Sequence, residues 1–193
     1  MLFESSRVRL RKMTMEDTVY YNKWRNDLEV MYSTNPSLDI YPIDATREFV
    51  EHVILGPPTT KSYLMIEKEN ESPIGILTLT NIDYKNRNAE CIIEIGERDY
   101  WGKGYGSEGL SLLLDYGFYE MNLHRISLRV FAFNNRAIRL YTKTGFQIEG
   151  TSRQSLFRNG QWHDVVHMGL LQKEYFRIRE IIYSDEDSEG TTH

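Results

Sequence analysis

A glycine-rich segment in the middle of the chain constrains the fold more than any other feature. Residues 101–106 read Trp-Gly-Lys-Gly-Tyr-Gly. An apolar pattern with helical spacing follows, carried by Leu110, Leu113, Leu114, Gly117 and Phe118. Glycines at the start of a helix leave backbone N–H groups unshielded, and the helix dipole adds positive potential there. The segment therefore predicts a binding site for an anion such as a phosphate or pyrophosphate, with a ligand-free tight turn as the alternative.

Two common phosphate-binding motifs do not match this segment. A P-loop needs a glycine at position 97 or 98 and a hydroxyl residue after Lys103, but Gly104 follows that lysine. A dinucleotide-binding fingerprint needs a glycine in place of Ser107, inside an N-terminal βαβ unit that the sequence lacks. The segment thus belongs to a different class of anion site.

The rest of the chain predicts one α+β fold with a single sheet. We expect strands at residues 8–12, 63–67, 74–82, 89–95 and 125–130, another from Phe146 onward, and a hairpin turn at Asn159-Gly160. We expect one helix after a Thr14 cap, with its apolar positions between residues 19 and 31, and others after Asp44, after the glycine-rich segment and at residues 136–143. A meander set between βα units predicts helices layered on a mixed sheet.

Charge and composition narrow the list of partners. The net charge is −5, and most of the excess lies in a C-terminal segment that holds Asp185, Glu186, Asp187 and Glu189. We therefore expect one domain over residues 1–183 and an acidic, disordered tail over residues 184–193. The nearly neutral body predicts no nucleic-acid partner.

The sequence also indicates a cellular compartment. A single cysteine, Cys91, cannot form an internal disulfide, which favours a reducing environment. The N-terminal residues lack the apolar core of a secretory signal, and no apolar run reaches the length of a membrane span. We expect a cytoplasmic protein with no membrane partner.

A second motif indicates a family. Residues 134–146 read Asn-Asn-Arg-Ala-Ile-Arg-Leu-Tyr-Thr-Lys-Thr-Gly-Phe, and together with residues 101–106 they resemble the acetyl-CoA-binding signature of the GNAT N-acetyltransferases. The likeness runs from about Arg7 to Phe176 and looks closest to the RimJ/RimL-like branch, whose members often have a Trp-Arg-Asn triplet such as residues 24–26. Trp101 stands where the superfamily usually has Gln or Arg, a common substitution in this branch.

The resemblance implies a fold and a set of binding residues. The fold would be a mixed, mostly antiparallel sheet flanked by helices, whose fourth and fifth strands splay to hold acetyl-CoA. The pantetheine arm would lie along Ile93, Glu94 and Ile95, and the pyrophosphate would be cradled by Trp101, Gly102, Lys103, Gly104, Tyr105, Gly106 and Ser107. Asn134 would bond the cofactor arm, and Tyr141 would protonate the departing thiolate.

The chemistry of acetyl transfer gives reasons for two catalytic candidates. An alkylammonium has a pKa of about 10.4 and must lose a proton before its nitrogen can attack a thioester. Glu94, which shares a strand face with Glu90, is the candidate base, and Tyr141 is the candidate acid. The alternatives are a structural role for both glutamates and a purely packed Tyr141. His163 and His167 would share a face, but two ligands are too few for a metal site, so we expect no metal.

The acceptor is the least defined part of the sequence. We expect direct attack of a primary amine in a ternary complex, with a protein N-terminal amine as the main hypothesis and a polyamine or another small amine as the alternative. Spermidine N-acetyltransferases look similar, but their acidic cluster after the first helix is replaced by residues 32–37, Tyr-Ser-Thr-Asn-Pro-Ser. Four acidic residues could still attract a cation: Asp39, Asp44, Glu48 and Glu51. A non-catalytic acetyl-CoA-binding module is a further alternative, and relatives imply a homodimer.

Overall fold

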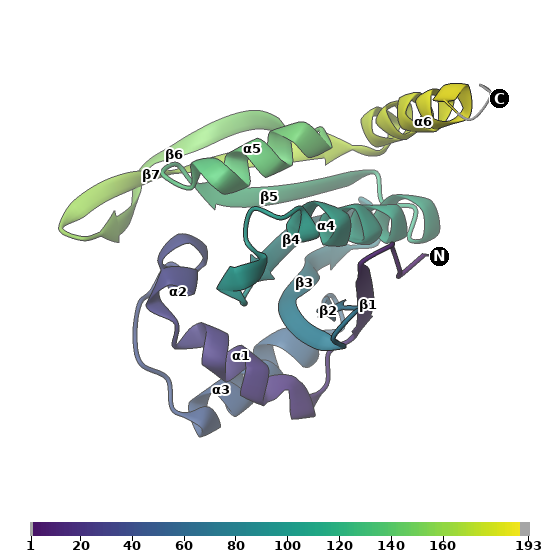
Figure 1. The fold of residues 1–193 in the computed structure, drawn as a ribbon. Coiled ribbons are helices and arrows are strands. Elements are labelled where there is room, and N and C mark those ends of the chain that lie inside the picture. Colours follow the sequence, from purple (N-terminus) through teal and green to yellow (C-terminus); the bar gives the residue numbers. More distant parts are fainter. Residues whose placement is uncertain (1, 190–193) are drawn as a thin grey trace.

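One mixed sheet forms the centre of the molecule (Figure 1). The computed structural model describes residues 2–189 of the 193-residue chain. Within them the sheet has seven strands in the order β1-β2-β3-β4-β5-β7-β6. The strands are β1 (Val8–Lys12), β2 (Lys61–Glu67), β3 (Ser72–Asp83), β4 (Asn88–Ile95), β5 (Arg125–Phe131), β6 (Gln147–Arg158) and β7 (Gln161–Leu171). All paired neighbours are antiparallel except β4 and β5, which confirms the predicted sheet.

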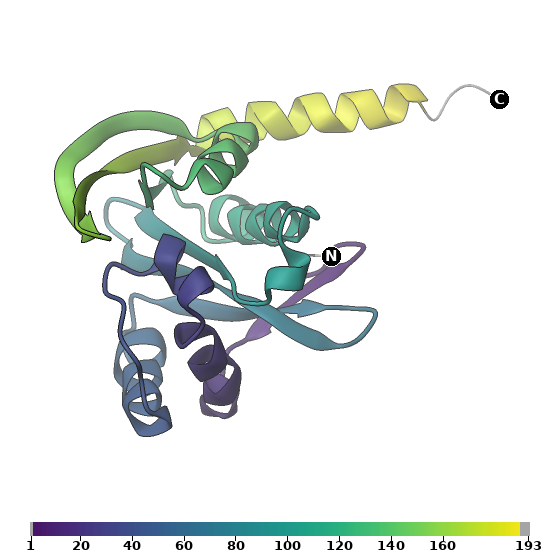
Figure 2. The same ribbon diagram turned by 60° about the vertical axis from the view of Figure 1, so that its left-hand side comes forward.

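Helices flank this sheet (Figures 1 and 2). The α-helices are α1 (Thr18–Arg25), α2 (Leu28–Thr34), α3 (Ile43–Phe49), α4 (Tyr105–Asp115), α5 (Asn135–Thr144) and α6 (Gln172–Glu189). Shorter helical turns are η1 (Met15–Asp17), η2 (Val50–Leu55), η3 (Arg98–Tyr100) and η4 (Tyr116–Glu120). Within residues 2–189, no helix combines the length and the apolar character needed to cross a bilayer.

Alternating side chains of the central strands bind both helical layers. On one face, Met65 and Leu77 pack in the main core with the apolar side of α4. On the other face, Leu64 packs with Trp24 of α1, and Ile76 packs in a separate cluster with Val50 of η2. Because successive residues of a strand point to opposite faces, β2 is buried along nearly its whole length.

The predicted helix between residues 19 and 31 is wrong as a single element. The chain breaks after α1, and Asp27 caps α2 by accepting hydrogen bonds from the backbone N–H groups of Glu29 (3.0 Å) and Val30 (3.4 Å). Val19 and Leu28 were expected on the buried face but are 58% and 60% exposed. The aspartate accepts hydrogen bonds from the free N–H groups at the start of a new helix, and this favours a new helix over continuation of the first one.

Two other expected helix caps have different outcomes. Thr14 does precede η1, where the Asp17 carboxylate accepts from the Thr14 backbone N–H (2.8 Å). Asp44 is not a cap, because α3 begins one residue earlier, after Pro42, and Asp44 pairs with Arg47 on its exposed surface. Pro42 is the N-cap residue instead, and its ψ of 155° is the extended conformation that is typical of this position.

The C-terminal third of the chain forms a hairpin and a helix. Asn159 and Gly160 have φ values of 51° and 75°, as the expected type I′ turn requires. Figure 2 shows α6 leaving the end of β7 and extending away from the sheet. This helix, which the sequence pattern did not predict, includes residues 184–189 of the expected tail, and residues 190–193 lie outside the described residues. The division at residue 183 stays a prediction.

The sheet opens between its two parallel strands. The pairing of β4 with β5 covers only residues Asn88 to Glu90, opposite Arg125 to Ser127. Beyond this point β4 continues to pair with β3, and β5 continues to pair with β7. The predicted splay of the fourth and fifth strands is therefore confirmed, and it leaves the later part of β4 with an edge that no strand covers.

Candidate active site

A cavity of about 670 Å³ lies where β4 and β5 diverge. Ten of the residues expected to bind the cofactor line it: Ile93, Glu94, Ile95, Trp101, Gly102, Gly104, Gly106, Ser107, Asn134 and Tyr141. Lys103 and Tyr105 do not line the cavity. The Lys103 carbonyl instead accepts from Arg7 (3.1 Å), and the Tyr105 ring packs edge-on against Tyr100.

The glycine loop, residues 101–106, has the geometry that an anion site needs. Gly102 and Gly104 adopt φ values of 73° and 89°, a left-handed region that side chains with a Cβ disfavour. Gly104 directly precedes α4, so the free N–H groups of the first turn of that helix begin at the edge of the cavity. The loop can therefore offer backbone donors and the positive end of a helix dipole to a phosphate.

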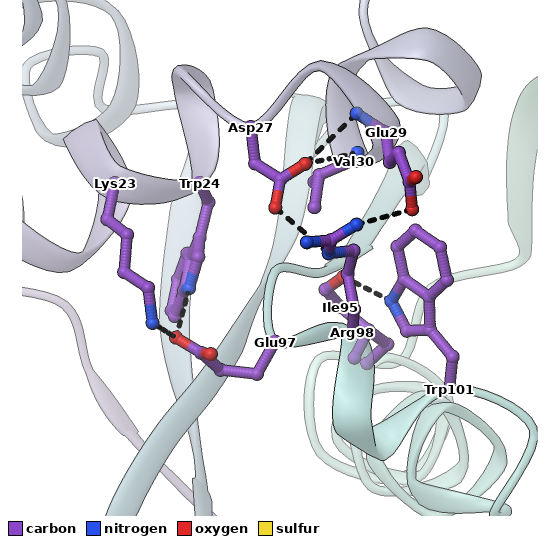
Figure 3. Close-up of polar contacts among 9 residues, drawn as sticks. All are labelled: Lys23, Trp24, Asp27, Glu29, Val30, Ile95, Glu97, Arg98 and Trp101. Atoms are coloured by element: carbon purple, nitrogen blue, oxygen red, sulfur yellow. Dashed lines mark hydrogen bonds and ion pairs between the residues drawn. The ribbon is translucent and has the colours of Figure 1, made fainter.

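Polar contacts connect Glu97 and Arg98, which lie between β4 and the glycine loop, to α1 and α2 (Figure 3). Glu97 accepts from Trp24 Nε1 (2.8 Å) and from Lys23 Nζ (2.5 Å). Arg98 pairs with Asp27 (3.1 Å) and Glu29 (2.5 Å). The segment that joins β4 to the glycine loop is thus connected to both N-terminal helices.

Trp101 and Arg136 lie together beside the glycine loop. The Trp101 indole Nε1 donates a hydrogen bond to the Ile95 carbonyl (2.8 Å) at the end of β4 (Figure 3). The Arg136 guanidinium of α5 lies over the Trp101 ring, 3.9 Å from its centroid, and Arg136 also lines the cavity. The sequence motifs did not single out Arg136 as a site residue, because its contact with Trp101 depends on how α5 is placed.

We call residues 32–36 the acceptor wall, and within this segment Ser33, Thr34 and Pro36 line the cavity. Arg158, which is only 4% exposed, donates to the carbonyls of Tyr32 (3.0 Å), Asn35 (2.6 Å) and Pro36 (3.3 Å). Asn134 donates from its side-chain amide to the Ser33 carbonyl (3.2 Å). The wall is therefore held in place by side chains that lie far away in the sequence.

Asn134 also has a structural role in α5. Its side-chain oxygen accepts from the Ala137 backbone N–H (3.1 Å) and so caps this helix. The expected hydrogen bond from Asn134 to the cofactor arm stays a prediction.

Glu94 combines burial with an unsatisfied carboxylate. It is 8% exposed, lines the cavity, and its Oε1 has no hydrogen-bond partner in the structure. Burial raises the pKa of Glu94 to about 7, although a hydrogen bond with Thr34 and the charge of Arg25 act in the opposite direction. A carboxyl group with this pKa exchanges a proton readily near neutral pH.

The Trp-Arg-Asn triplet supports the surroundings of Glu94. Arg25 is 8% exposed and is stacked by Tyr41 (3.7 Å to the ring centroid) and Phe49 (4.3 Å). Asn26 holds the backbone of Tyr41 through both its amide oxygen and its amide nitrogen (2.9 Å each). These contacts give Arg25 and Asn26 a part in the site that the sequence motif alone did not show.

Tyr141 lies in α5 at the cavity. It is 7% exposed, and burial together with the neighbouring Cys91 raises the pKa of its hydroxyl above the ordinary value. Burial also raises the pKa of Cys91 to about 12, so that both groups stay protonated at neutral pH. The Tyr141 hydroxyl is therefore neutral and can donate a hydrogen bond to a group in the cavity.

Further polar residues of the cavity come from β5, β6 and β7. His167 Nε2 lies 2.7 Å from Ser152 Oγ, and Arg129 donates to Glu90 (2.7 Å). His163 does not line the cavity, and its ring packs against Phe133 (4.9 Å). Among the described residues, no group of three His, Cys, Asp or Glu side chains could hold a metal ion.

The four acidic residues considered for attracting a cation do not reach the cavity. Asp39, Asp44, Glu48 and Glu51 are all exposed, and none of them is a lining residue. The carboxylates that do line it are Glu90 and Glu94 of β4.

Comparisons with known proteins agree with this arrangement. Residues 7–147 match the family model described as an acetyltransferase (GNAT) domain. The uncharacterized N-acetyltransferase p20 of Bacillus licheniformis is 33% identical over 89% of this chain and 96% of its own length. The spermidine N(1)-acetyltransferase of Escherichia coli K12 is 30% identical over 87% of this chain and 88% of its own. A crystal structure of the Vibrio cholerae spermidine N-acetyltransferase with CoA and spermine has a TM-score of 0.80 and 28% identity, covering 89% of this chain and 99% of that one.

Proposed function

Because the chain belongs to the GNAT acetyltransferase family, we propose that it moves the acetyl group of acetyl-CoA to a primary amine of a polyamine such as spermidine or spermine. The observation that carries the proposal is the joint position of Glu94, Tyr141 and the glycine loop along one cavity. The relatives named as spermidine N-acetyltransferases support the polyamine acceptor. This acceptor has more support than the protein N-terminal amine that was the main hypothesis from the sequence.

The residues of the cavity fit acetyl-CoA. The uncovered edge of β4 offers backbone groups to an amide-containing arm, and the glycine loop offers N–H donors to a pyrophosphate. When bound, acetyl-CoA supplies an activated acetyl thioester. Backbone N–H groups along the open edge of β4 would stabilise the negative charge that develops on its carbonyl oxygen.

Glu94 and Tyr141 would manage the protons. At pH values above its pKa of about 7, the Glu94 carboxylate can accept the proton that the acceptor ammonium must lose, directly or through water. The neutral Tyr141 hydroxyl can then donate a hydrogen bond to the departing thiolate, whose pKa is about 8.5 by analogy with cysteine, or pass it a proton late in the step if its own proton is replaced from water. Direct attack in one ternary complex needs no covalent enzyme intermediate.

The acceptor is tested by measuring thiol release from acetyl-CoA with a panel of amines. The panel contains spermidine, spermine, aminoglycosides, amino sugars and peptides with free N-termini. We expect the highest kcat/KM with a polyamine. Selective release with peptides would overturn the polyamine acceptor, and no release with any amine despite tight binding of acetyl-CoA would favour a binding module.

The homodimer stays a prediction, and size-exclusion chromatography with light scattering tests it.

The role of Tyr141 is tested by Tyr141→Phe. This change removes one hydroxyl and keeps the ring that packs against Phe146. We expect kcat to fall by about tenfold or more while the Kd of acetyl-CoA stays within about twofold. Equal turnover in the variant would exclude Tyr141 from proton transfer.

A further inference from the structure

Arg136 is a cation at the glycine loop to which none of the motifs gives a role. It lies in the first turn of α5 and lines the cavity. Its guanidinium lies 3.9 Å from the centroid of the Trp101 ring. A guanidinium over the face of an indole is attracted by the ring quadrupole, so Trp101 holds the charge of Arg136 beside the loop.

The ring that holds Arg136 is itself fixed. The Trp101 Nε1 donates to the Ile95 carbonyl, which ties the ring to the end of β4 (Figure 3). The glycine turn and the first N–H groups of α4 follow directly in the chain. The guanidinium and the backbone donors are therefore placed along the same cavity.

Lys103 belongs to the loop but does not line the cavity, and three other cations near the loop have carboxylate partners. Arg7 pairs with Glu108, Lys23 pairs with Glu97, and Arg98 pairs with Asp27 and Glu29. Among the described residues, Arg136 has no ion pair with a carboxylate, and no nearby acidic group acts on its charge. A guanidinium without a carboxylate partner, at a cavity that offers N–H donors, fits an anionic ligand.

We propose that Trp101 and Arg136 form a phosphate clamp, in which the Trp101 ring positions the Arg136 guanidinium to bind a phosphate group of coenzyme A. The loop, residues 101–106, contains no arginine. Through this clamp, α5 supplies the guanidinium that the loop itself lacks. The inference rests on the proposed use of acetyl-CoA and adds the side chains that select its phosphates.

Isothermal titration calorimetry with coenzyme A and with 3′-dephospho-coenzyme A tests the clamp. Arg136→Ala is compared with Arg139→Ala, a control on an exposed residue of the same helix that does not line the cavity. We expect Arg136→Ala to weaken coenzyme A binding by about tenfold to a hundredfold, as is typical for a hydrogen bond to a charged group. Arg139→Ala should stay within about twofold of the wild type.

The two ligands distinguish the phosphates. An equal loss with both ligands would assign Arg136 to the pyrophosphate, and a loss with coenzyme A alone would assign it to the 3′-phosphate. Either result supports the clamp. The clamp would be overturned if the Arg136→Ala variant bound both ligands as tightly as the Arg139→Ala variant.

A double-mutant cycle tests the positioning by Trp101. We expect Trp101→Leu to weaken coenzyme A binding, and Arg136→Ala to add little in the Trp101→Leu background. Fully additive losses would overturn the positioning role. Circular dichroism of each variant checks that the fold is kept.

The wild-type measurement separates this proposal from the proposed function. If the wild-type protein fails to bind coenzyme A, both the acetyl-transfer function and the clamp are overturned. If the wild type binds tightly and the Arg136→Ala variant binds equally tightly, the clamp alone is overturned.

Discussion

The two sides of the cavity are built in different ways. The glycine loop is a short continuous segment whose backbone, with the helix that follows it, would form the proposed anion site. The acceptor wall is held by Arg158, which contacts Tyr32 across 126 positions of the chain, and by Asn134, which contacts Ser33 across 101. A site made of local backbone can be reused for the same cosubstrate, while a wall made of distant side chains can change with the acceptor.

The largest effect is expected from breaking the acceptor wall with Arg158→Met. The change leaves carbonyls at the end of α2 without their buried donor and removes a cation from the negative end of that helix. We expect the free energy of unfolding to fall by about 3 kcal/mol in urea titrations, and the KM of the amine to rise more than the Kd of acetyl-CoA.

Arg153→Met is the matched control for that change. Arg153 is an exposed residue of the same strand, β6. We expect its replacement to change the stability by less than about 0.5 kcal/mol. A loss below about 1 kcal/mol for Arg158→Met would mean that the wall does not depend on this arginine.

Glu94→Gln tests the residue of β4 that faces the acceptor wall. A carboxyl whose pKa is raised from 4.5 to about 7 destabilises the folded protein as the pH rises and the group ionises. The wild type should therefore lose stability relative to Glu94→Gln between about pH 5 and pH 8. We expect the difference to reach about 2 kcal/mol, because the buried amide keeps part of the cost of desolvation.

The same variant should lose activity. We expect kcat/KM to fall by about a hundredfold, and the limb of the wild-type pH profile near pH 7 to disappear. A variant that keeps both that limb and its turnover would exclude Glu94 as the base.

On the cosubstrate side, Gly104→Ala tests the glycine loop. The φ of 89° disfavours any residue with a Cβ, and an added Cβ would lie 3.1 Å from the Arg7 guanidinium. We expect a loss of about 1 kcal/mol of stability and weaker acetyl-CoA binding with an unchanged KM for the amine. Gly150→Ala, at a position with open space around it, is the control. A rise in the amine KM alone would contradict this division of the site.

The smallest effect is expected from Arg98→Gln, which cuts one connection between the two sides. Arg98 is 48% exposed, and its partners Asp27 and Glu29 belong to the start of α2. Exposed ion pairs contribute little, so we expect a small loss of stability in urea titrations that disappears in about 1 M NaCl. A loss that persists at high salt would mean that Arg98 acts through packing.

Local patterns predicted the parts of the protein that depend on neighbouring residues. The alternation of the strands, the Asn159-Gly160 turn and the glycine loop were all predicted from residues close in sequence. The division of the first helix was missed, although the Asn26-Asp27 pair is a local signal for a new helix start. The α6 helix was missed because its acidic end is also typical of a disordered tail.

The remaining site residues had no local signal. Arg136 lies inside the recognised segment 134–146, but nothing in that segment specifies its contact with Trp101. Arg158 and His167 lie in ordinary strand patterns, and their partners come from other elements of the fold. Glu94 was proposed from its strand face, but its unpaired oxygen and raised pKa depend on what covers it.

The sequence alone predicted the family, through the resemblance of residues 101–106 and 134–146 to a known signature. It also predicted the type of sheet and a candidate anion-binding loop, because strand periodicity, turn residues and helix starts are governed by interactions between near neighbours. Only the tertiary structure decided which carboxylate is buried, where Arg136 meets Trp101 and how Arg158 holds the acceptor wall. Burial, pKa and ion pairing depend on groups brought together by folding, and the spacing of residues along the chain does not specify them.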